Sequence, residues 1–380
     1  MSEVLILGAR APVALELARR FLRAGWGVHV ADSISCRGTA WSSAVSTVST
    51  VASARFAPEA FVRDIGAIVN RRRIDLVLPT CEEVFALSRH RNMLPAQARV
   101  LANDFELLSA LHSKWKFLEL ARSAMMRVPE SARVGTIEEA RDWAEGCPII
   151  LKPEYSRFGV HLRRYPEGIP RHADALGGPG AWIAQRLLTG EEVCSYSVAS
   201  EGRLLMHAAY VPRYRLHGSS SYYFDPCACP ALEDAVRRLV NGLKFSGQIS
   251  FDWIVDADGI PHAIECNPRT TSGAHVFGTE EGLVAALCGE PATVAATERH
   301  ARMIAPLMLV SGWRQAMGRQ GIGQWSQDFR RATDILMEPG DRAPLLGGII
   351  DLTMFGWIAA REGVALREAS THDLQWDGPP

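Results

Sequence analysis

Residues 245–273 bring together acidic and polar side chains at a spacing that could bind a metal ion. Two β-rich runs, Ile249–Val255 and Pro261–Cys266, flank Asp258-Gly259, which is a two-residue hairpin signal. Side chains along a strand alternate between the two faces of a sheet. The sequence therefore predicts a hairpin in which a two-residue turn fixes the facing pairs. A longer turn would shift the direct pairing by two residues and keep the same face.

Four polar side chains share one face of this predicted hairpin. With the two-residue turn, Asp252 lies directly opposite Glu265, and Ser250 lies directly opposite Asn267. Two facing carboxylates repel each other, and a hard cation relieves the repulsion. The Asn267 amide oxygen would complete an oxygen-only ligand set suited to Mg²⁺. Arg269 could bind a phosphate in bidentate fashion. The alternative is a solvated polar hairpin face beside a core.

Bulk properties limit the classes of partner. The chain has 380 residues, enough for two or three domains, and its 47% hydrophobic and 22% charged content is typical of globular proteins. A net charge of −1 gives no global attraction to nucleic acid or anionic membranes, so we expect neither as a partner. The eight cysteines include no CxxC pair. Reduced thiols fit best, and we expect a cytoplasmic protein.

Residues 1–105 alternate predicted strands and helices. This alternation predicts a Rossmann-like α/β domain with a parallel sheet. The loops after its strands, which hold Arg10, Asp32 and residues 80–83, would open on a ligand crevice. The turn after Gly8 is not a GxGxxG fingerprint, so no dinucleotide site is expected.

The rest of the chain contributes two lysines in predicted elements. One helix is expected over Phe105–Ala124 and carries Lys114, and a strand over Pro148–Pro153 carries Lys152. Residues 301–380 look like mixed helix and loop without recognisable chemistry. Their last residues, Trp376–Pro380, are expected to be a frayed tail.

The order of these features resembles the ATP-grasp superfamily, over roughly residues 1–280. An α/β domain is followed by Lys114, by Lys152 before a small loop, by the stretch Trp182–Glu192, and by a hairpin ending in Ile264–Arg269. The E-x-N-P-R pattern in that last stretch is fairly specific, whereas the lysines are weak signals alone. The pattern is most similar to carboxylate–amine ligases and to carbamoyl-phosphate-synthase-like members.

The resemblance implies α/β and α+β architecture, an ATP-grasp fold with an N-terminal Rossmann-like (pre-ATP-grasp) parallel-sheet domain. The boundaries we expect are 1–105 for the N-terminal domain, 106–188 for the ATP-grasp small subdomain, 189–300 for the subdomain with the metal hairpin, and 301–380 for a C-terminal extension.

The resemblance also implies a role for each matching residue. Lys114 and Lys152 would contact the α- and β-phosphates of ATP, and Glu192 would bind the ribose, with Glu191 its immediate rival. A surface lysine is the alternative for Lys114. The backbone of Gln185, Arg186 and Leu187 would contact the adenine. Mg²⁺ or Mn²⁺ would be bound by Asp252, Glu265 and Asn267. Arg269 would stabilise the transferring phosphoryl group or the acyl phosphate.

Two departures from the family pattern leave the number of metal ions open. Many members have a glycine-rich loop after the strand lysine, whereas residues 155–159 contain only Gly159. Many also carry an acidic residue or Gln where this chain has Ser250, and here the carboxylate comes two residues later, at Asp252.

The predicted reaction is ATP-dependent ligation of a small-molecule carboxylate to an amine, amino acids among them, through an acyl phosphate, with release of ADP and phosphate. The alternatives are carbamoyl- or carboxyphosphate chemistry and a non-catalytic ATP-binding regulatory protein. A homodimer is left open. Glu82 or Glu83 could instead cap the following helix, and His275 could be a satisfied loop histidine. The candidate contacts for the acid and the amine are Arg10, Glu82, Glu83, Ser272 and His275.

Overall fold

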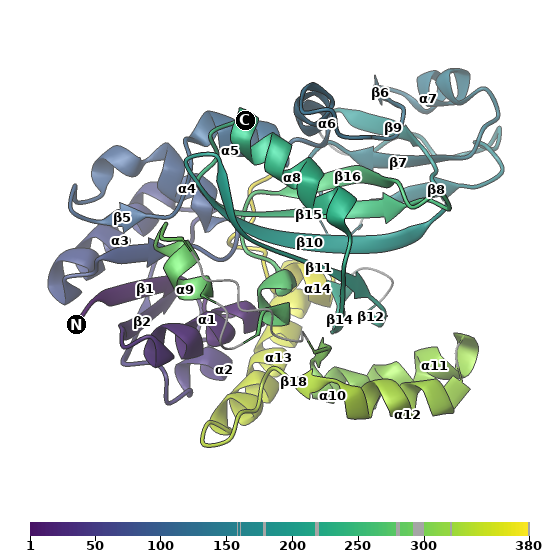
Figure 1. Ribbon diagram of the computed structural model, residues 1–380. Helices are drawn as coiled ribbons and strands as arrows, with labels where there is room; N and C mark the ends of the chain where they lie inside the picture. The colour runs from purple at the N-terminus through teal and green to yellow at the C-terminus, as the bar shows by residue number, and fades with distance from the viewer. Residues whose placement is uncertain are drawn as a thin grey trace.

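The described residues form three larger sheets and one two-stranded sheet, with helices between and around them (Figure 1). A computed structural model describes residues 1–157, 159, 161–177, 180–216, 220–278, 282–291, 300–319 and 321–378.

The N-terminal sheet is parallel, as expected, with strand order β3-β2-β1-β4-β5. Each strand is short, and β1, β2 and β4 are almost wholly buried because helices cover both faces. The strand order reverses between β1 and β4, which opens a crevice at their carboxyl ends. The elements are β1 (Glu3–Leu7), α1 (Pro12–Arg23), β2 (Gly27–Asp32), α2 (Arg37–Ala40), β3 (Thr47–Thr50), α3 (Pro58–Arg72), β4 (Leu76–Leu78), α4 (Glu83–Arg89), η1 (Arg91–Met93) and β5 (Arg99–Val100).

Two helices follow where the sequence predicted one. The expected single helix over Phe105–Ala124 is wrong: α5 (Phe105–His112) ends before Ser113, and α6 (Lys114–Ser123) begins after it. Ser113 has extended backbone angles, and its hydroxyl accepts a hydrogen bond from the Lys116 backbone N–H, which caps α6. The break sets Lys114 at the first position of a helix.

The small sheet has the order β6-β9-β7-β8, and all its pairs are antiparallel. Its apolar side packs under α7, whose N-cap Thr136 accepts a hydrogen bond from the Glu139 N–H. The other side carries Lys152 and Gln185. The elements are β6 (Ser131–Val134), α7 (Ile137–Ala144), β7 (Ile149–Pro153), β8 (Arg163–Tyr165) and β9 (Trp182–Arg186).

The large sheet has the order β16-β15-β10-β11-β14-β17-β18. Helices α6 and α8 cover one face, and η2 and α9 bridge the other face to the N-terminal domain. The elements are β10 (Glu191–Ser200), β11 (Arg203–Pro212), β14 (Tyr223–Cys227), α8 (Pro230–Gly242), β15 (Gly247–Val255), β16 (Pro261–Asn267), η2 (Ser272–Val276), α9 (Leu283–Leu287), β17 (Arg302–Met303) and β18 (Thr333–Asp334), with β12 (Arg215–Leu216) and β13 (Ser220–Ser221) as a separate pair.

The hairpin β15–β16 has the predicted facing pairs, Asp252 with Glu265 and Ser250 with Asn267. The predicted two-residue turn is wrong, because Val255 pairs with Pro261 and the loop spans 256–260. A β-bulge restores the register: opposite Asp252 and Trp253, the ladder steps from Glu265 to Ala263, so Ile264 is the extra residue. The bulge therefore keeps both carboxylates on one face.

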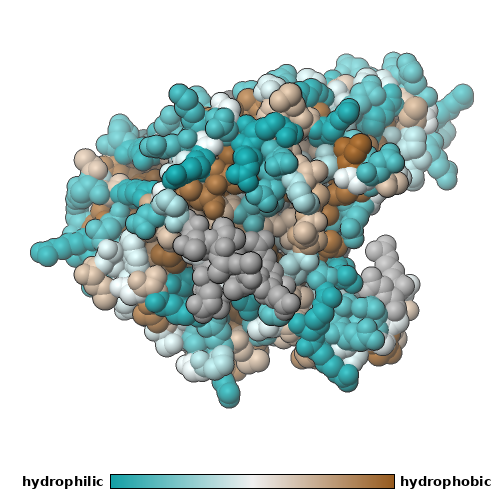
Figure 2. Space-filling view, viewed as in Figure 1, coloured by the Kyte–Doolittle hydropathy of each residue, from teal (hydrophilic) through white to brown (hydrophobic). Residues whose placement is uncertain are grey.

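The C-terminal region is more ordered than the sequence suggested. Helices α11 and α12 form an arm that a notch separates from the main body (Figures 1 and 2). The predicted frayed tail at Trp376 is wrong for the described residues through 378, because Leu374 is buried in the N-terminal domain and Trp376 stacks on Phe85. The remaining helices are α10 (Ala305–Leu307), η3 (Met308–Gly312), α11 (Trp313–Arg319), α12 (Gly321–Arg331), α13 (Ala343–Glu362) and α14 (Leu366–Ala369).

Helix α13 is long and apolar enough to cross a membrane by length and composition, and it is the one such helix in the described ranges. Only 17% of that stretch is buried. Its inner side rests on α2, where Asp351 accepts hydrogen bonds from the Arg37 and Gly38 N–H groups. Gly347 lies so close that an added Cβ would stand 2.3 Å from the Arg37 carbonyl oxygen. The sequence analysis missed this helix.

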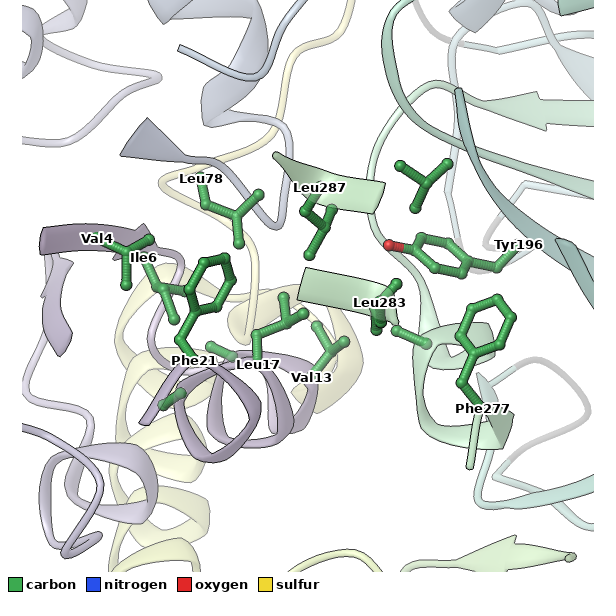
Figure 3. Packing of buried hydrophobic residues seen from close by; sticks show 14 of the residues in the cluster. Val4, Ile6, Val13, Leu17, Phe21, Leu78, Tyr196, Phe277, Leu283 and Leu287 are labelled. Carbon is green, nitrogen blue, oxygen red and sulfur yellow. The ribbon is translucent and has the colours of Figure 1, made fainter. Parts of the chain in front are cut away.

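One hydrophobic core joins the N-terminal domain to the large sheet. Leu283 and Leu287 of α9 point between α1, which carries Leu17 and Phe21, and Tyr196 of β10 (Figure 3). All five side chains are buried. The crevice between domain and sheet is therefore fixed by a shared core rather than by a flexible linker.

Replacing Leu287 with Ala tests this shared core. We expect the free energy of unfolding to fall by about 2–5 kcal/mol, because removing a buried leucine side chain leaves a cavity. The N-terminal domain and the large sheet should still unfold in a single transition. Urea unfolding followed by circular dichroism measures it. The control Leu22→Ala, on the exposed side of α1, should change the free energy by about 0.5 kcal/mol or less. Two separate transitions, with only one shifted by Leu287→Ala, would contradict the shared core.

Candidate active site

A cavity of about 500 Å³ lies between the small and large sheets. It is lined by side chains from β7, β9, β10, β15 and β16 and from the start of α6. The residues predicted from the sequence that line it are Lys114, Lys152, Gln185, Arg186, Leu187, Glu192, Asp252, Glu265, Asn267, Arg269 and Ser272.

Two carboxylates face each other on its floor. Asp252 and Glu265 are paired across β15 and β16, and burial, reinforced by the Glu265 charge, raises the pKa of Asp252 to about 7. A bound cation would offset both the burial of the carboxylates and their mutual repulsion, since it neutralises the pair and replaces the lost hydration. The Asn267 amide oxygen lies on the same face and accepts from Arg269 Nη2 at 3.3 Å. This donor set of oxygens fits Mg²⁺ or Mn²⁺.

The two lysines reach the cavity from different elements, Lys114 from α6 and Lys152 from β7, and both are held mainly by neutral acceptors. Lys152 Nζ donates to the Gln185 Oε1 at 3.0 Å and to the Ile264 carbonyl at 3.1 Å. That carbonyl belongs to the bulged residue, so the bulge creates the acceptor. Lys114 Nζ donates to the Ser156 carbonyl at 2.7 Å and lies 3.8 Å from Glu265 Oε1.

Burial lowers the pKa of Lys152 to about 8, although the Glu265 charge opposes the shift. In the described part of the chain, no carboxylate lies within 4 Å of its ammonium. A buried ammonium without a paired anion attracts one strongly. Lys152 is therefore prepared to bind an anionic group such as a phosphate.

The predicted hinge has most of its N–H groups in use. The Arg186 N–H donates to the Glu130 carbonyl and the Leu187 N–H donates to the Pro148 carbonyl, both at 3.0 Å. An adenine base bound at this end of β9 would therefore meet the backbone carbonyls of the predicted hinge and the neighbouring residue Leu188, which also lines the cavity. The sequence analysis missed Leu188 because its pattern marks only the preceding strand.

Of the two rival glutamates, Glu192 faces the cavity. Glu192 lines it and pairs with Arg215 Nη2 at 2.6 Å, whereas Glu191, one residue earlier on β10, is exposed. Strand alternation accounts for the difference. Arg215 also lines the cavity, and nothing in its local sequence pointed to it.

Three predicted contacts for the acid and the amine lie elsewhere. Arg10 forms buried ion pairs with Asp32 and Asp373. The Glu83 carboxylate accepts from the Thr80 and Cys81 N–H groups, so it fixes the loop before α4 and does not cap the helix itself. We therefore remove Arg10 and Glu83 from the candidate set.

His275 is the third predicted contact that lies away from the cavity. It is buried with its ring nitrogen 3.5 Å from Glu16 and its ring stacked on Phe224. Burial lowers its pKa, although Glu16 opposes the shift. Its place between α1 and η2 makes it part of the joint between domain and sheet, so it also leaves the candidate set.

Two predicted contacts remain candidates, since Ser272 lines the cavity and Glu82 lies directly behind two arginines that line it. Glu82 is buried, forms an ion pair with Arg157, and has Oε1 3.6 Å from Arg269 Nε. Arg157 lines the cavity from the loop after β7. The sequence analysis missed Arg157, although a basic residue five positions after Lys152 in a phosphate loop was a usable signal.

Comparisons with known proteins identify distant relatives of the chain. No protein-family model matches the chain. It is 33% identical over 138 residues to D-alanine–D-alanine ligase of Anaeromyxobacter dehalogenans, a match covering 32% of this chain and 44% of that ligase. It is 24% identical over 196 residues to the arginine-specific carbamoyl phosphate synthase large chain of Neurospora crassa, covering 46% of this chain and 17% of that protein. The chain thus spans less than half the length of either relative.

The fold also matches a solved structure. The biotin carboxylase domain of 2-oxoglutarate carboxylase from Hydrogenobacter thermophilus, in complex with MgADP and bicarbonate, superposes with a TM-score of 0.61. The match covers 78% of this chain and 73% of that one at 13% identity. At this identity the likeness shows the fold alone, and it confirms the ATP-grasp fold predicted from the sequence.

The facing carboxylates predict that Asp252→Asn stabilises the metal-free protein. The native pKa of Asp252, about 7, lies above its ordinary value of 3.8, so native stability falls as the pH rises from 3.8 to 7, and the full cost is present above pH 7. In EDTA at pH 8 we expect the free energy of unfolding to rise by on the order of 1 kcal/mol or more, and the gain to shrink as the pH falls to 5, where the wild-type carboxyl is protonated. Thermal unfolding at both pH values measures it.

The matched control is Asp258→Asn, an exposed aspartate in the loop of the same hairpin, which should leave stability unchanged at both pH values. Destabilisation of the Asp252→Asn protein at pH 8 would show that no repulsion is stored between the two carboxylates.

Proposed function

The chain belongs to the ATP-grasp superfamily, and from that premise we propose that it is a ligase that uses ATP to join a carboxylate to an amine. Its relatives and its fold support an ATP-grasp enzyme of the ATP-dependent ligase or carboxylase type. The finer proposal names the bond formed, an amide, and the products, ADP and phosphate.

The observation that carries the proposal is the convergence of opposite charges in one cavity. Lys114 and Lys152 supply cations to the cavity, and Asp252 and Glu265 supply carboxylates close to them. Phosphoryl transfer needs positioning and charge neutralisation more than covalent chemistry. Asp252, Glu265 and Asn267 would hold Mg²⁺, which neutralises phosphate charge when bound.

The chain's own groups then account for each requirement of the reaction. The two lysines bind and orient the phosphates, because their ammonium groups point into the cavity from α6 and β7. Glu192 accepts the ribose hydroxyls. Arg269 faces the cavity from the end of β16, where a guanidinium can stabilise the transferring phosphoryl group and the acyl phosphate.

The carboxylate attacks the γ-phosphate, so that an acyl phosphate forms and ADP leaves. The amine then attacks the acyl carbon, the amide bond forms, and the C–O bond to phosphate breaks. Water competes with the amine at this stage, so the site must be closed. Small-molecule acids and amines, amino acids among them, are the substrates we propose, because the D-alanine–D-alanine ligase match includes that chemistry in its name.

A second reaction has its own support. The carbamoyl phosphate synthase match and the bicarbonate in the biotin carboxylase structure favour bicarbonate as the acid, which would give carboxyphosphate instead. The reaction would use the same lysines and carboxylates. Only the acid separates it from the ligase proposal.

ADP release tests the proposal directly. The purified protein with MgATP should release ADP faster with pooled amino acids than without them, and the stimulation should fall by about 10²-fold or more in Glu265→Gln, because a charge at the transferring phosphate is lost. Splitting the pool then names the acid and the amine.

The control Glu191→Gln changes an exposed glutamate on β10 and should keep full activity. Stimulation by bicarbonate alone would replace the ligase with carboxyphosphate chemistry. Unchanged turnover in the Glu265→Gln protein would contradict the assignment of the site.

A further inference from the structure

Residues 370–378, which we call the strap, cross the crevice of the N-terminal domain. The strap leaves α14, runs past the carboxyl ends of β1 and β2, and ends beside α5 (Figure 1). In an open α/β sheet this crevice is the usual place for a ligand. Here part of it is filled by the chain itself.

Several contacts fix the strap to the N-terminal domain. Leu374 is 4% exposed and packs in the core under β1 and β2. Asp373 pairs with Arg10 and accepts from Ser33, and the Asp373 carbonyl accepts from the Arg55 N–H at 3.1 Å. A buried leucine and a buried ion pair hold a segment firmly. The strap is therefore a permanent part of the crevice.

Trp376 joins three parts of the molecule. Its ring stacks on Phe85 of α4 at 4.4 Å and meets the edges of Phe105 of α5 and Tyr155 of the loop after β7, both at 5.5 Å. Its backbone N–H donates to Glu82 Oε2 at 3.0 Å, and its backbone carbonyl accepts from Arg157 Nη2 at 3.4 Å. The loop that carries Arg157 thus rests on the strap.

The point where these parts meet contains unsatisfied polar atoms. Glu82 Oε1 and Arg269 Nε are both buried without a hydrogen-bond partner among the described residues, and they lie 3.6 Å apart. Burial lowers the pKa of Arg157, and the nearby Arg269 charge adds to the shift. Two arginines compete for one carboxylate, so an additional anion would be favoured there.

We propose that the strap is the closing surface of the active site on the side of the acid and the amine. Trp376 is a positioning residue: it seats the loop after β7 and holds Glu82, which in turn fixes Arg157 and Arg269 toward the reacting carboxylate. The assignment of that carboxylate rests on the proposed function, whereas the seating of the loop does not.

Hydrogen exchange tests the packing of the loop after β7 against Trp376 without any acid or amine substrate. In the presence of MgADP, backbone amides in residues 149–157 should exchange about tenfold faster in Trp376→Ala than in the wild type, because lost ring contacts make local opening easier. Trp376→Phe keeps an aromatic ring and should restore most of the protection. The control Trp41→Ala removes a partly exposed tryptophan elsewhere and should change nothing in this segment.

Unchanged exchange in Trp376→Ala would overturn the proposal. Equal loosening of α8 and residues 149–157 would also count against it, because it would indicate general destabilisation. In the ADP assay, Glu82→Gln and Trp376→Ala should each raise KM for the stimulating amino acid roughly tenfold. The affinity of both variants for ADP, measured by calorimetry, should stay within about twofold of the wild type. If the wild type shows no stimulation, the proposed function fails, and the exchange result still decides the strap.

A second observation concerns the outer side of α13. Its inner side, with Gly347 and Asp351, is fixed on α2. On the opposite side, large apolar residues follow the helical spacing of three and four and are 37–61% exposed: Leu346, Ile349, Ile350 and Trp357. With the flanking Leu352 they leave on the order of 500 Å² of apolar surface, at the upper end of what a monomer normally exposes.

We infer that this stripe binds the same stripe of a second copy of the chain. A standard interface takes about 800 Å² from each partner, so the stripe could form its apolar centre. The charged side chain that touches the stripe is Arg361, which lies over the Trp357 ring and pairs with Glu362. Because Glu362 balances this charge, two copies related by a two-fold axis would meet with little like-charge repulsion. A bilayer fits less well, since the buried, hydrogen-bonded Asp351 holds the middle of the helix on α2. Beside the stripe, the basic side chain Arg361 is already engaged with Trp357 and Glu362, whereas anionic lipid is bound by a helix face rich in lysine and arginine.

Light scattering after size exclusion tests the pairing in the full chain. The wild type should have twice the monomer mass, Ile349→Glu with Trp357→Glu should have the monomer mass, and the control Met125→Glu, an exposed methionine remote from α13, should remain a dimer. A monomeric wild type would overturn the proposal, as would a monomer that co-sediments with phosphatidylcholine–phosphatidylglycerol vesicles. A dimer that survives the double substitution would place the interface elsewhere and overturn it as well.

Discussion

Repulsion between the Asp252 and Glu265 carboxylates is the interaction around which the site is arranged. The opposite face of β15 carries Phe251 and Trp253, both fully buried in the core with α6 and α8. Turning the strand to release Asp252 into water would expose two large aromatic side chains, at a cost well above that of one buried carboxyl. The pair is therefore held facing the cavity, and a bound cation together with an anionic nucleotide relieves the repulsion.

The bulge at Ile264 links this pair to the small sheet. It keeps Glu265 opposite Asp252 after a loop longer than two residues, and its carbonyl holds Lys152. The cap at Ser113 acts in the same way for Lys114, because it starts a new helix at the point nearest Glu265. Local backbone features therefore bring cations and carboxylates together in one cavity, as the positioning and charge neutralisation of phosphoryl transfer require.

The fold class and the cavity residues from Lys114 to Ser272 could be predicted because strand alternation and the family pattern are local in the sequence. Arg10, Glu83 and His275 could not be sorted in this way, since their partners are distant residues such as Asp373 and Glu16 or depend on loop geometry. The strap did leave a signal, because Leu374 and Trp376 alternate with polar neighbours as in a half-buried extended segment. The domain boundaries and the compartment stay predictions.

A crystal structure of the protein with Mg²⁺ and a non-hydrolysable ATP analogue tests the central claim most directly. The account predicts one or more Mg²⁺ ions bound by the Asp252 and Glu265 carboxylates at about 2.1 Å, with the phosphates against Lys114 and Lys152. A nucleotide bound with its phosphates away from this pair, or an ion that leaves Asp252 unbound, would contradict the account.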